Sequence, residues 1–251
     1  MIPRIIHYCW FGMNPKPKLA EKCILSWKKY CYDFQFMEWT EDTFDIRSAP
    51  QYVQDAYKEK KWAFVSDYVR FVKLVEFGGI YLDTDVELLK PLEPFLSHIA
   101  FSGTEDGENV SAGVMGCVRD YSLFKELRDN YKRRSFYNSD GSQNLTTVVE
   151  MLTELCKKKG YRPENVLQDL EGFVIYPSEY FYPLSNADRV MRKAGNTVSI
   201  HWFAGSWISD ERKKKKKKRQ FKNRIKQRIV AVIGNDLFER MKATLHYKSD
   251  D

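Results

Sequence analysis

Residues 62–92 read WAFVSDYVRFVKLVEFGGIYLDTDVELLKPL, and this stretch decides the fold. Apolar residues recur at three- and four-residue steps between Phe64 and Phe77, which predicts a helix with a buried face. Gly78-Gly79 then ends the helix, as glycine does just past a helix C-terminus. Ile80-Tyr81-Leu82 is β-branched, aromatic and apolar, which predicts a short buried strand. The stretch therefore predicts a helix that leads directly into a strand of an α/β sheet.

Asp83 and Asp85 follow this strand with one residue between them. Because positions two apart in an extended chain face the same way, we expect both carboxylates to reach one divalent cation. Mn²⁺ and Mg²⁺ suit carboxylate ligands and leave coordination positions for substrate phosphates. An isolated Asp-x-Asp pair has a second interpretation, which is a solvated turn after a strand. The pair therefore predicts a metal site only together with its strand and helix context.

That context extends on both sides of the aspartate pair. In chain order the segments are Ser66-Asp67-x-x-Arg70, Gly78-Gly79-Ile80-Tyr81, Asp83-x-Asp85 and Lys90-Pro91-Leu92. This string resembles the signature of glycosyltransferase family 32, which includes bacterial capsular polysaccharide glycosyltransferases and yeast initiating mannosyltransferases. The clostridial glucosylating toxins are more distant members. The resemblance covers nearly all of residues 1–210.

The resemblance implies the fold and the reaction. The expected fold is α/β, a GT-A type domain for nucleotide-diphospho-sugars with a mixed central sheet flanked by helices. The expected reaction is the metal-dependent transfer of a hexose from a nucleotide sugar to a glycan acceptor, with retained anomeric configuration. Such an enzyme would act in polysaccharide or lipid-linked oligosaccharide synthesis. Retention normally suggests a carboxylate nucleophile, and none is identifiable here, so a front-face route is the expectation.

The resemblance also assigns roles within the 62–92 stretch. Asp83 and Asp85 would hold Mn²⁺ or Mg²⁺. Asp67 and Arg70 lie three apart, so they project from one face of the helix. They would bind the hydroxyls of the sugar and the ribose through charge-assisted hydrogen bonds. Ser66 and Tyr81 would flank the nucleoside.

The N-terminal run RIIHYCWFG, residues 4–12, predicts a central first strand followed by a loop. Open α/β sheets bind ligands at the carboxyl ends of their strands, and Trp10 lies near such an end. The residue is a core tryptophan or a stacking surface for a nucleobase. The run resembles the first strand of the same family, whose tryptophan stacks on uracil, so a UDP-hexose is the expected donor. We expect His7 to be a core histidine.

The remaining segments up to residue 183 complete an α/β pattern. Helices are predicted over 18–32, 50–60, 121–134 and 148–160, and strands over 34–39, 99–103 and 112–117, with an acidic loop at 105–109. Polar residues 140–147 suit a helix cap, and the family places a donor-sugar contact near this helix start, which makes Asn144 a candidate. The aromatic stretch 176–183 is either an acceptor-binding wall or a packed loop.

The stretch 199–207, SIHWFAGSW, contains the other candidate site residues. A histidine nitrogen is a suitable Mn²⁺ ligand, and a serine hydroxyl and an indole N–H can donate to a diphosphate. The alternative is a structural histidine. The stretch resembles the His-x-x-x-x-Ser-Trp ending of the family domain, which implies that His201 binds the metal and that Ser206 and Trp207 contact the nucleotide.

The charge of the chain is concentrated in one segment. Of the 41 Lys and Arg, 12 lie in residues 212–228, which leaves 29 in the remainder against all 34 Asp and Glu. We therefore divide the chain into a catalytic domain at 1–210 and a basic helical tail at 211–251. Apolar residues recur at helical steps in the tail, so it would lie on an anionic membrane surface, dock onto the domain or pair with another subunit. The oligomeric state is left open.

Composition bounds the remaining possibilities. A chain of 251 residues with 43% hydrophobic residues can bury one sizeable core. Five cysteines without a Cys-x-x-Cys pair fit reduced thiols, and the absence of an apolar signal or long apolar run predicts a cytoplasmic protein. The basic tail would place it peripherally on the inner face of the membrane.

Three other functions are compatible with parts of the sequence. Asp83 after an apolar strand also suits a haloacid-dehalogenase-like phosphatase, but the preceding helix has no place in that motif. The basic tail suggests nucleic-acid binding, but it has no interleaved aromatics, so we expect no nucleic-acid partner. A non-catalytic sugar-binding protein would keep Trp10 and need no aspartate pair.

Overall fold

The computed structural model describes residues 1–205 together with Lys214, Lys218, Gln220, Phe221, Ile225 and Val230. The chain divides into two compact units, of which the larger comprises Met1–Pro183 and Arg192–Trp207. The smaller unit comprises Leu184–Met191 and Ile208–Asp251 and is described only in part. The expected tail, 211–251, therefore lies almost entirely outside the described residues, and the following paragraphs concern the larger unit.

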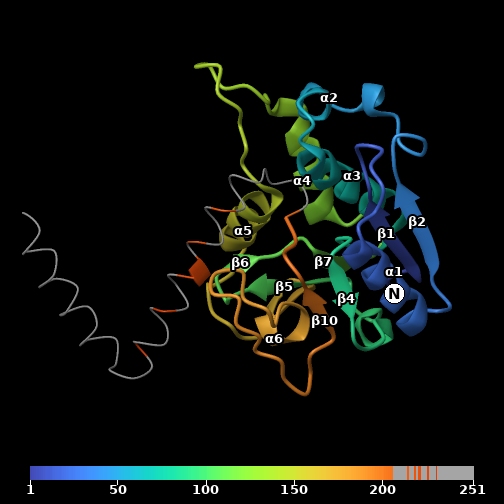
Figure 1. The fold of residues 1–251 in the computed structure, drawn as a ribbon, viewed down its shortest axis with the longest axis vertical. Helices are drawn as coiled ribbons and strands as arrows, with labels where there is room; N and C mark the ends of the chain where they lie inside the picture. Colours follow the sequence, from blue (N-terminus) through green and yellow to red (C-terminus); the bar gives the residue numbers. More distant parts are fainter. Residues whose placement is uncertain (206–213, 215–217, 219, 222–224, 226–229, 231–251) are drawn as a thin grey trace, which may run out of the picture. The chain divides into compact units, whose positions relative to one another are not determined.

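The larger unit alternates helices and strands along the chain (Figure 1). The helices are α1 (Lys18–Tyr30), α2 (Gln51–Lys58), α3 (Trp62–Phe77), α4 (Ser122–Asn130), α5 (Val148–Lys158) and α6 (Ser178–Phe181). The strands are β1 (Ile5–Cys9), β2 (Gln35–Trp39), β3 (Gly79–Leu82), β4 (Val86–Leu88), β5 (Ala100–Glu105), β6 (Asn109–Val110), β7 (Val114–Cys117), β8 (Gln168–Leu170), β9 (Phe173–Tyr176) and β10 (Ser199–His201).

The main sheet has the strand order β2-β1-β3-β7-β5-β9-β8, with β6 hydrogen-bonded to β5. Strand β1 runs parallel to β2 and β3, while β7 runs antiparallel to both β3 and β5. The sheet is therefore mixed, as expected. Because β3 and β5 both oppose β7, they run in the same direction, and the carboxyl ends of β1, β3 and β5 lie at one edge.

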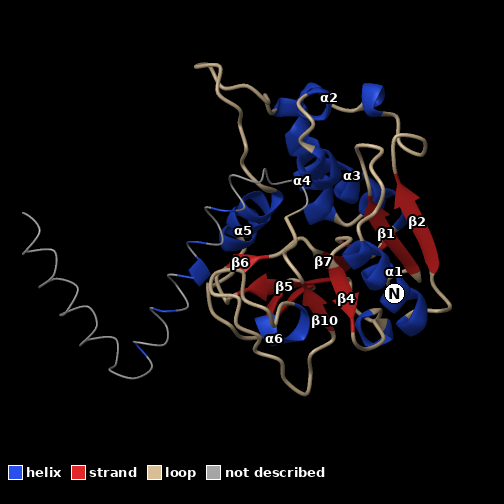
Figure 2. Ribbon diagram, in the orientation of Figure 1, coloured by secondary structure: helices blue, strands red, loops and turns tan. Residues whose placement is uncertain are grey.

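Both faces of the sheet are buried, and helices surround its strands (Figure 2). Alternation along β3 shows this directly, since Tyr81 belongs to one core cluster while Ile80 and Leu82 belong to the other. Helices α2, α3, α4 and α5 contribute to the first cluster and α1 and α6 to the second. Alternating side chains of a strand point to opposite faces, so a sheet with continuous apolar strands needs this double covering.

Helix α3 and strand β3 form as the sequence predicts. The helix ends at Gly78, whose φ of 67° is in the left-handed region. A Cβ at Gly78 would lie 2.7 Å from the backbone nitrogen of Arg119, so this position requires glycine twice over. The turn carries the chain from α3 directly into β3, which lies between β1 and β7. The residues that follow β3 therefore reach the sheet edge near its centre.

Several predicted boundaries are corrected by the structure. The helix expected over 121–134 ends at Asn130 and continues as a 3-10 turn, Tyr131–Arg133. The acidic loop expected at 105–109 is shorter, because Glu105 is the last residue of β5 and Asn109–Val110 pairs back onto it. The stretch 199–207 begins with a strand, because Ser199–His201 forms β10, and His201 is its last residue.

Candidate metal centre

Asp83 and Asp85 lie in a tight turn between β3 and β4. The backbone nitrogen of Val86 donates to the carbonyl oxygen of Asp83 at 2.9 Å, which closes the turn. The extended geometry expected from the sequence is therefore wrong. The convergence of the two side chains is nevertheless correct, because the turn brings carboxylate oxygens of both residues into one cluster. The nitrogen of Asp83 also donates to Gly113 at 2.8 Å, which fixes the turn to the segment before β7.

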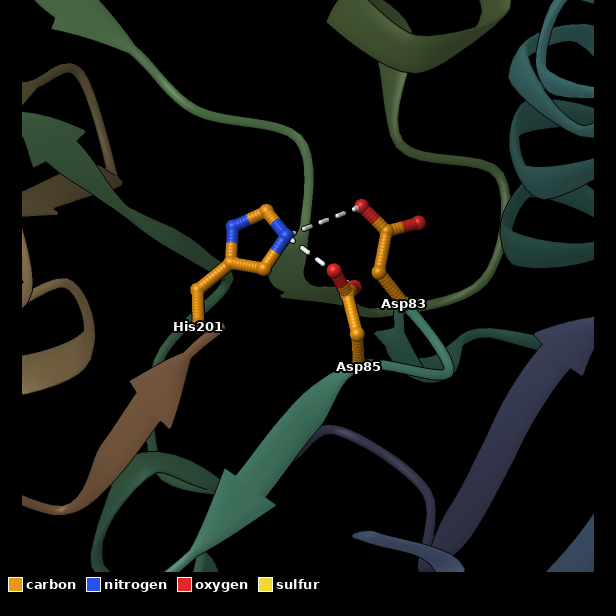
Figure 3. Close-up of side chains that lie close together, drawn as sticks. All are labelled: Asp83, Asp85 and His201. Atoms are coloured by element: carbon orange, nitrogen blue, oxygen red, sulfur yellow. Dashed lines mark ion pairs between the residues drawn. The ribbon is translucent and has the colours of Figure 1, made fainter. Parts of the chain in front are cut away.

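His201 completes the cluster from a segment more than 100 residues away. Strand β10 pairs antiparallel with β4 in a separate two-stranded sheet, and His201 is opposite Val86. Nε2 of His201 lies 3.1 Å from Oδ1 of Asp85 and 4.0 Å from Oδ2 of Asp83. The three side chains point toward one another (Figure 3). One ligand atom from each lies within 4.8 Å of the others.

The segment after β10 also holds Asp85 in place. The backbone nitrogen of Ala204 donates to Oδ2 of Asp85 at 2.7 Å, and the nitrogen of Trp202 donates to its carbonyl oxygen at 2.9 Å. One carboxylate oxygen of Asp85 is thus held by the backbone while the other faces His201. The site depends on the pairing of β4 with β10 as much as on the aspartate spacing.

The charges in the cluster are strongly coupled. Burial alone would lower the pKa of His201, but the charge and hydrogen bond of Asp85, together with Asp83 and Glu105, raise that pKa to about 9. Burial by itself would raise the pKa of Asp85. The charge and hydrogen bond of His201 and the hydrogen bond from the Ala204 backbone nitrogen outweigh the effect of burial, so the pKa of Asp85 is lowered. The metal-free cluster therefore holds a protonated imidazole between carboxylates near neutral pH.

These residues fit a hard divalent cation. Two carboxylates and one imidazole provide the oxygen and nitrogen donors that Mn²⁺ accepts, and three protein ligands leave positions for other oxygen ligands. Nδ1 of His201 is buried and has no hydrogen-bond partner among the described residues, so nothing there fixes the ring tautomer against coordination through Nε2.

Arg70 links helix α3 to the cluster. Its Nη2 donates to Oδ1 of Asp67 at 2.7 Å, and its Nη1 donates to the carbonyl oxygen of Ala112 at 2.7 Å. Nη1 also lies 3.4 Å from Oδ1 of Asp83. Asp67 and Arg70 are 7% and 4% exposed, so in this structure they contact each other and position Asp83. Their expected contacts with sugar and ribose hydroxyls stay predictions.

Tyr81 and Ser66 lie close to this pair. The Arg70 guanidinium lies over the Tyr81 ring, 4.4 Å from its centroid, and Tyr81 is 1% exposed. Tyr81 thus supports Arg70 from below and offers no open face to a nucleoside in this structure. The hydroxyl of Ser66 donates to the carbonyl oxygen of Trp62 within α3 at 3.1 Å. Both residues are near the edge where we expect the nucleoside, and their contact with it stays a prediction.

Trp10 lies at the same sheet edge, directly after β1. Its backbone nitrogen donates to the carbonyl oxygen of Trp39 at 2.9 Å, and its Nε1 donates to that of Asn14 at 2.6 Å. The side chain is partly exposed and is not among the buried core residues. Because β1 is parallel to β3, Trp10 and Asp83 follow neighbouring carboxyl ends. This placement suits the stacking surface that the sequence suggests.

Asn144 and the C-terminal candidates have different outcomes. Asn144 uses its side chain locally, since Nδ2 donates to Ser135 and Oδ1 accepts from Thr146. The cap of α5 is Thr147, which forms a capping box with Glu150. Asn144 therefore holds the preceding turn, and its contact with a sugar stays a prediction. Ser206 and Trp207 lie outside the described residues.

Gly113 lies beside the candidate metal ligands and was not among the candidate residues identified from the sequence. A Cβ added there would lie 3.0 Å from Oδ2 of Asp83 and 3.2 Å from Cε1 of His201. The absence of a side chain leaves room for both metal-ligand candidates to approach the strand edge. Its place between small residues before a strand was the available clue.

Comparison with known proteins assigns the segment that contains the aspartates. A family described as "Glycosyltransferase sugar-binding region containing DXD motif" matches residues 17–102. Inositol phosphoceramide mannosyltransferase 3 of Schizosaccharomyces pombe is 27% identical over 142 residues, which cover 54% of this chain and 38% of that protein. An uncharacterized glycosyltransferase of Acanthamoeba polyphaga mimivirus is 27% identical over 194 residues, covering 72% and 75% of the two chains.

A human relative and a solved structure complete the comparison. Alpha-1,4-N-acetylglucosaminyltransferase of Homo sapiens is 28% identical over 134 residues, or 52% of this chain and 37% of that protein. The chain thus spans little more than a third of the yeast and human relatives. The PaToxG glycosyltransferase structure aligns with a TM-score of 0.50 at 17% identity, covering 63% of this chain and 69% of that one, which supports the GT-A fold. The segment 17–102, with Asp83 and Asp85 near its end, is thus similar to glycosyltransferase sugar-binding regions that contain the DXD motif.

Proposed function

We propose that this protein transfers a hexose from a nucleoside diphosphate sugar to a glycan acceptor, with a divalent cation at Asp83, Asp85 and His201. The observation that supports it most directly is the convergence of these three side chains at one sheet edge. The match of residues 17–102 to a glycosyltransferase sugar-binding region gives the reaction class. Trp10 at the neighbouring strand end favours a UDP-linked donor, because an indole face can stack on uracil.

Different residues of the site would bind different parts of the donor. A bound Mn²⁺ or Mg²⁺ would neutralise the negative charge that develops on the leaving diphosphate. Asp83 and Asp85 hold their oxygens toward this position, and Arg70 keeps Asp83 oriented through the 3.4 Å contact. Asp67 and Arg70 would then bind sugar and ribose hydroxyls, with Ser66 and Tyr81 beside the nucleoside. Ser206 and Trp207 would donate hydrogen bonds to the diphosphate from the segment after His201.

We further propose that the transfer retains the anomeric configuration by a front-face route. The acceptor oxygen bonds to the anomeric carbon as the bond from that carbon to the phosphate oxygen breaks. The acceptor proton passes to the departing phosphate, so no protein base is needed for the balance of the step. The expected product is a polysaccharide or lipid-linked oligosaccharide.

The basic segment would place the enzyme at its acceptor. We propose that residues 1–210 form the catalytic domain and that 211–251 lie on an anionic membrane surface on its cytoplasmic side, where lysines and arginines contact lipid headgroups. Within the part of the chain that the structure describes, none of the helices has the length and apolar character needed to span a membrane. Peripheral contact is thus the form of membrane association that the proposal invokes.

Donor binding and turnover test the proposal. The full-length protein is heated with Mn²⁺ and, in turn, UDP-glucose, UDP-galactose, UDP-N-acetylglucosamine and GDP-mannose, because a ligand that binds only the folded state raises the melting temperature. We expect the largest stabilisation from a UDP-hexose, loss of it with a chelator, and release of free UDP on incubation. Release of inorganic phosphate from phosphate monoesters, without nucleotide release, would instead favour the phosphatase alternative.

A further inference from the structure

Glu105 lies at the same sheet edge as the metal-ligand candidates, and no role has been assigned to it so far. It is the last residue of β5, and β5 is separated from β3 only by β7. The carboxyl end of β5 therefore points the same way as that of β3, where Asp83 follows. Gly113, directly before β7, lies between the two positions in the strand order.

The strand order arranges the edge residues in a line. Trp10 follows β1, Asp83 follows β3, Gly113 precedes β7 and Glu105 ends β5. Neighbouring strands are about 4.8 Å apart, so Glu105 is displaced by roughly 10 Å from the β3 end, on the side opposite Trp10. A nucleoside diphosphate sugar with its base near Trp10 and its diphosphate near Asp83 and Asp85 places its sugar ring toward Glu105. Gly113 leaves space along this path.

The Glu105 side chain is held in a fixed position by one of its oxygens. The hydroxyl of Ser111 donates to Oε1 of Glu105 at 2.6 Å. Ser111 is 1% exposed, and its backbone nitrogen donates to the carbonyl oxygen of Gly103 at 2.8 Å. The second oxygen, Oε2, has no hydrogen-bond partner within residues 1–205. One oxygen is thus anchored and the other is available.

The surroundings of Glu105 do not explain it as a structural residue. None of the described Lys or Arg side chains forms an ion pair with it. Burial raises the pKa of Glu105, and this outweighs the opposite effects of His201 and the Ser111 hydrogen bond. A partly buried carboxylate without an ion pair to Lys or Arg costs stability, and such groups concentrate at functional sites.

We propose that Glu105, oriented by Ser111, accepts a hydrogen bond through Oε2 from a sugar hydroxyl beyond the diphosphate. The inference rests on the proposed function and adds a sugar-selecting residue to it. The hydroxyl belongs either to the transferred hexose or to the acceptor sugar. A carboxylate in this position discriminates against a sugar that lacks the hydroxyl, because Oε2 would then lose its water without gaining a partner.

The test compares a nucleotide with its sugar-bearing form. Dissociation constants of UDP and UDP-glucose are measured with Mn²⁺ for the unmodified protein, Glu105→Ala, Glu105→Gln and the control Glu108→Ala. Glu108 is an exposed carboxylate in the turn that follows β5, so its removal changes the charge equally. We expect Glu105→Ala to weaken UDP-glucose binding about 10-fold or more while UDP binding stays unchanged. Glu105→Gln keeps an acceptor oxygen and should lose less UDP-glucose affinity than Glu105→Ala. It replaces the alanine variant in the test if that variant does not fold.

The source of the hydroxyl is separated by a second measurement. If the affinities are unchanged but methyl glycosides no longer stimulate UDP release in Glu105→Ala alone, the hydroxyl belongs to the acceptor. Unchanged affinities together with unchanged stimulation in a folded Glu105→Ala overturn the inference, and so does an equal loss of UDP and UDP-glucose binding. These results leave the proposed function intact. If the unmodified protein binds no nucleotide sugar at all, the proposed function itself is rejected, and the inference with it.

Discussion

The two histidines His7 and His201 are both buried in the sheet region, yet their surroundings are opposite. His7 is 0% exposed on β1, where its Nε2 donates to the carbonyl oxygen of Gly78 at 2.8 Å and its Nδ1 accepts from Nε1 of Trp39 at 3.3 Å. His201 is 8% exposed on β10, where its Nε2 faces Asp85 and its Nδ1 has no partner among the described residues. Neutral partners satisfy the first ring completely, whereas carboxylates surround the second.

The consequence is an opposite shift of the two pKa values. Burial lowers the pKa of His7 to about 4, and the Gly78 hydrogen bond only partly opposes it. Despite similar burial, Asp85 and Asp83 raise the pKa of His201 to about 9. Burial alone therefore does not separate a structural histidine from a ligand. The chemical type of the neighbouring polar groups does.

Removing the carboxylate nearest to His201 should have the largest effect. Asp85→Asn takes away both a metal ligand and the main cause of the raised His201 pKa, so we expect nucleotide-sugar turnover to fall by more than about 100-fold. The pKa of His201 should move downward, toward the behaviour of His7, which nuclear magnetic resonance titration can follow. The exposed Asp42→Asn is the control. Full turnover in Asp85→Asn would contradict the metal assignment.

Replacing each histidine in turn should separate binding from folding. His201→Gln should weaken Mn²⁺ binding by about 10- to 100-fold, since replacing even a residue that only hydrogen-bonds to a metal ligand lowers metal affinity by this factor. His7→Gln should leave Mn²⁺ affinity unchanged and lower the free energy of unfolding by about 1–3 kcal/mol, because its buried partners lose good geometry. Calorimetric titration with Mn²⁺ and denaturant unfolding measure the two quantities. Equal effects of the two substitutions on Mn²⁺ affinity would remove the distinction.

A methyl group at Gly113 should disturb the cluster around His201 and leave His7 unaffected. The added Cβ would lie 3.0 Å from Asp83 and 3.2 Å from His201, so these side chains must shift by a few tenths of an ångström. We expect Gly113→Ala to reduce Mn²⁺ affinity by about 10-fold, which is within the range seen when residues that orient metal ligands are changed. Gly195→Ala is the matched control, because nothing lies within 4 Å of its added Cβ. A Gly113→Ala protein with normal Mn²⁺ affinity would show that the cluster adapts.

The two histidines should stabilise the protein in opposite pH ranges, and each should change the melting temperature by about a few °C. Unfolded histidine has a pKa near 6.5. The raised pKa of His201 gives stability that is present below about pH 6.5 and lost as the pH rises toward 9. The lowered pKa of His7 gives stability that is present above about pH 6.5 and lost as the pH falls toward 4.

Differences in melting temperature between the unmodified protein and each glutamine variant, measured from pH 4 to 9.5, isolate these two windows. Added Mn²⁺ needs the unprotonated His201 ring, so its stabilising effect should increase across the upper window. A stabilisation by Mn²⁺ that does not change with pH would place the ion away from His201.

The first part of the sheet follows from the sequence because each element has its own local signal. The helix α3 has three- and four-residue apolar spacing, Gly78 ends it, and Ile80 to Leu82 form the strand that was predicted. The run Phe173–Tyr176 forms β9 and was not predicted, although its β-branched and aromatic residues suit a buried strand. Only its last residue, Tyr176, belongs to the aromatic stretch 176–183, and no element was assigned to the residues before it.

The candidate metal ligands were identified from the sequence, whereas the residues and strand pairing that hold them in place were not. Asp83, Asp85 and His201 were identified and do converge. The pairing of β4 with β10 that brings them together involves strands of three residues, which are too short for any periodic pattern. Gly113 and Glu105 act through their neighbours in the sheet order, and that order depends on contacts between distant segments. Such long-range pairing carries no signal in a single local stretch.

The pairing of β4 with β10 also sets an order in time for protein synthesis. Chains grow at about 5–20 residues per second, so His201 is added roughly 6–25 s after Asp85. During that interval the two carboxylates exist without the imidazole and without the backbone donor of Ala204 that holds Asp85. A nascent chain can therefore build most of the sheet before it can hold a cation tightly.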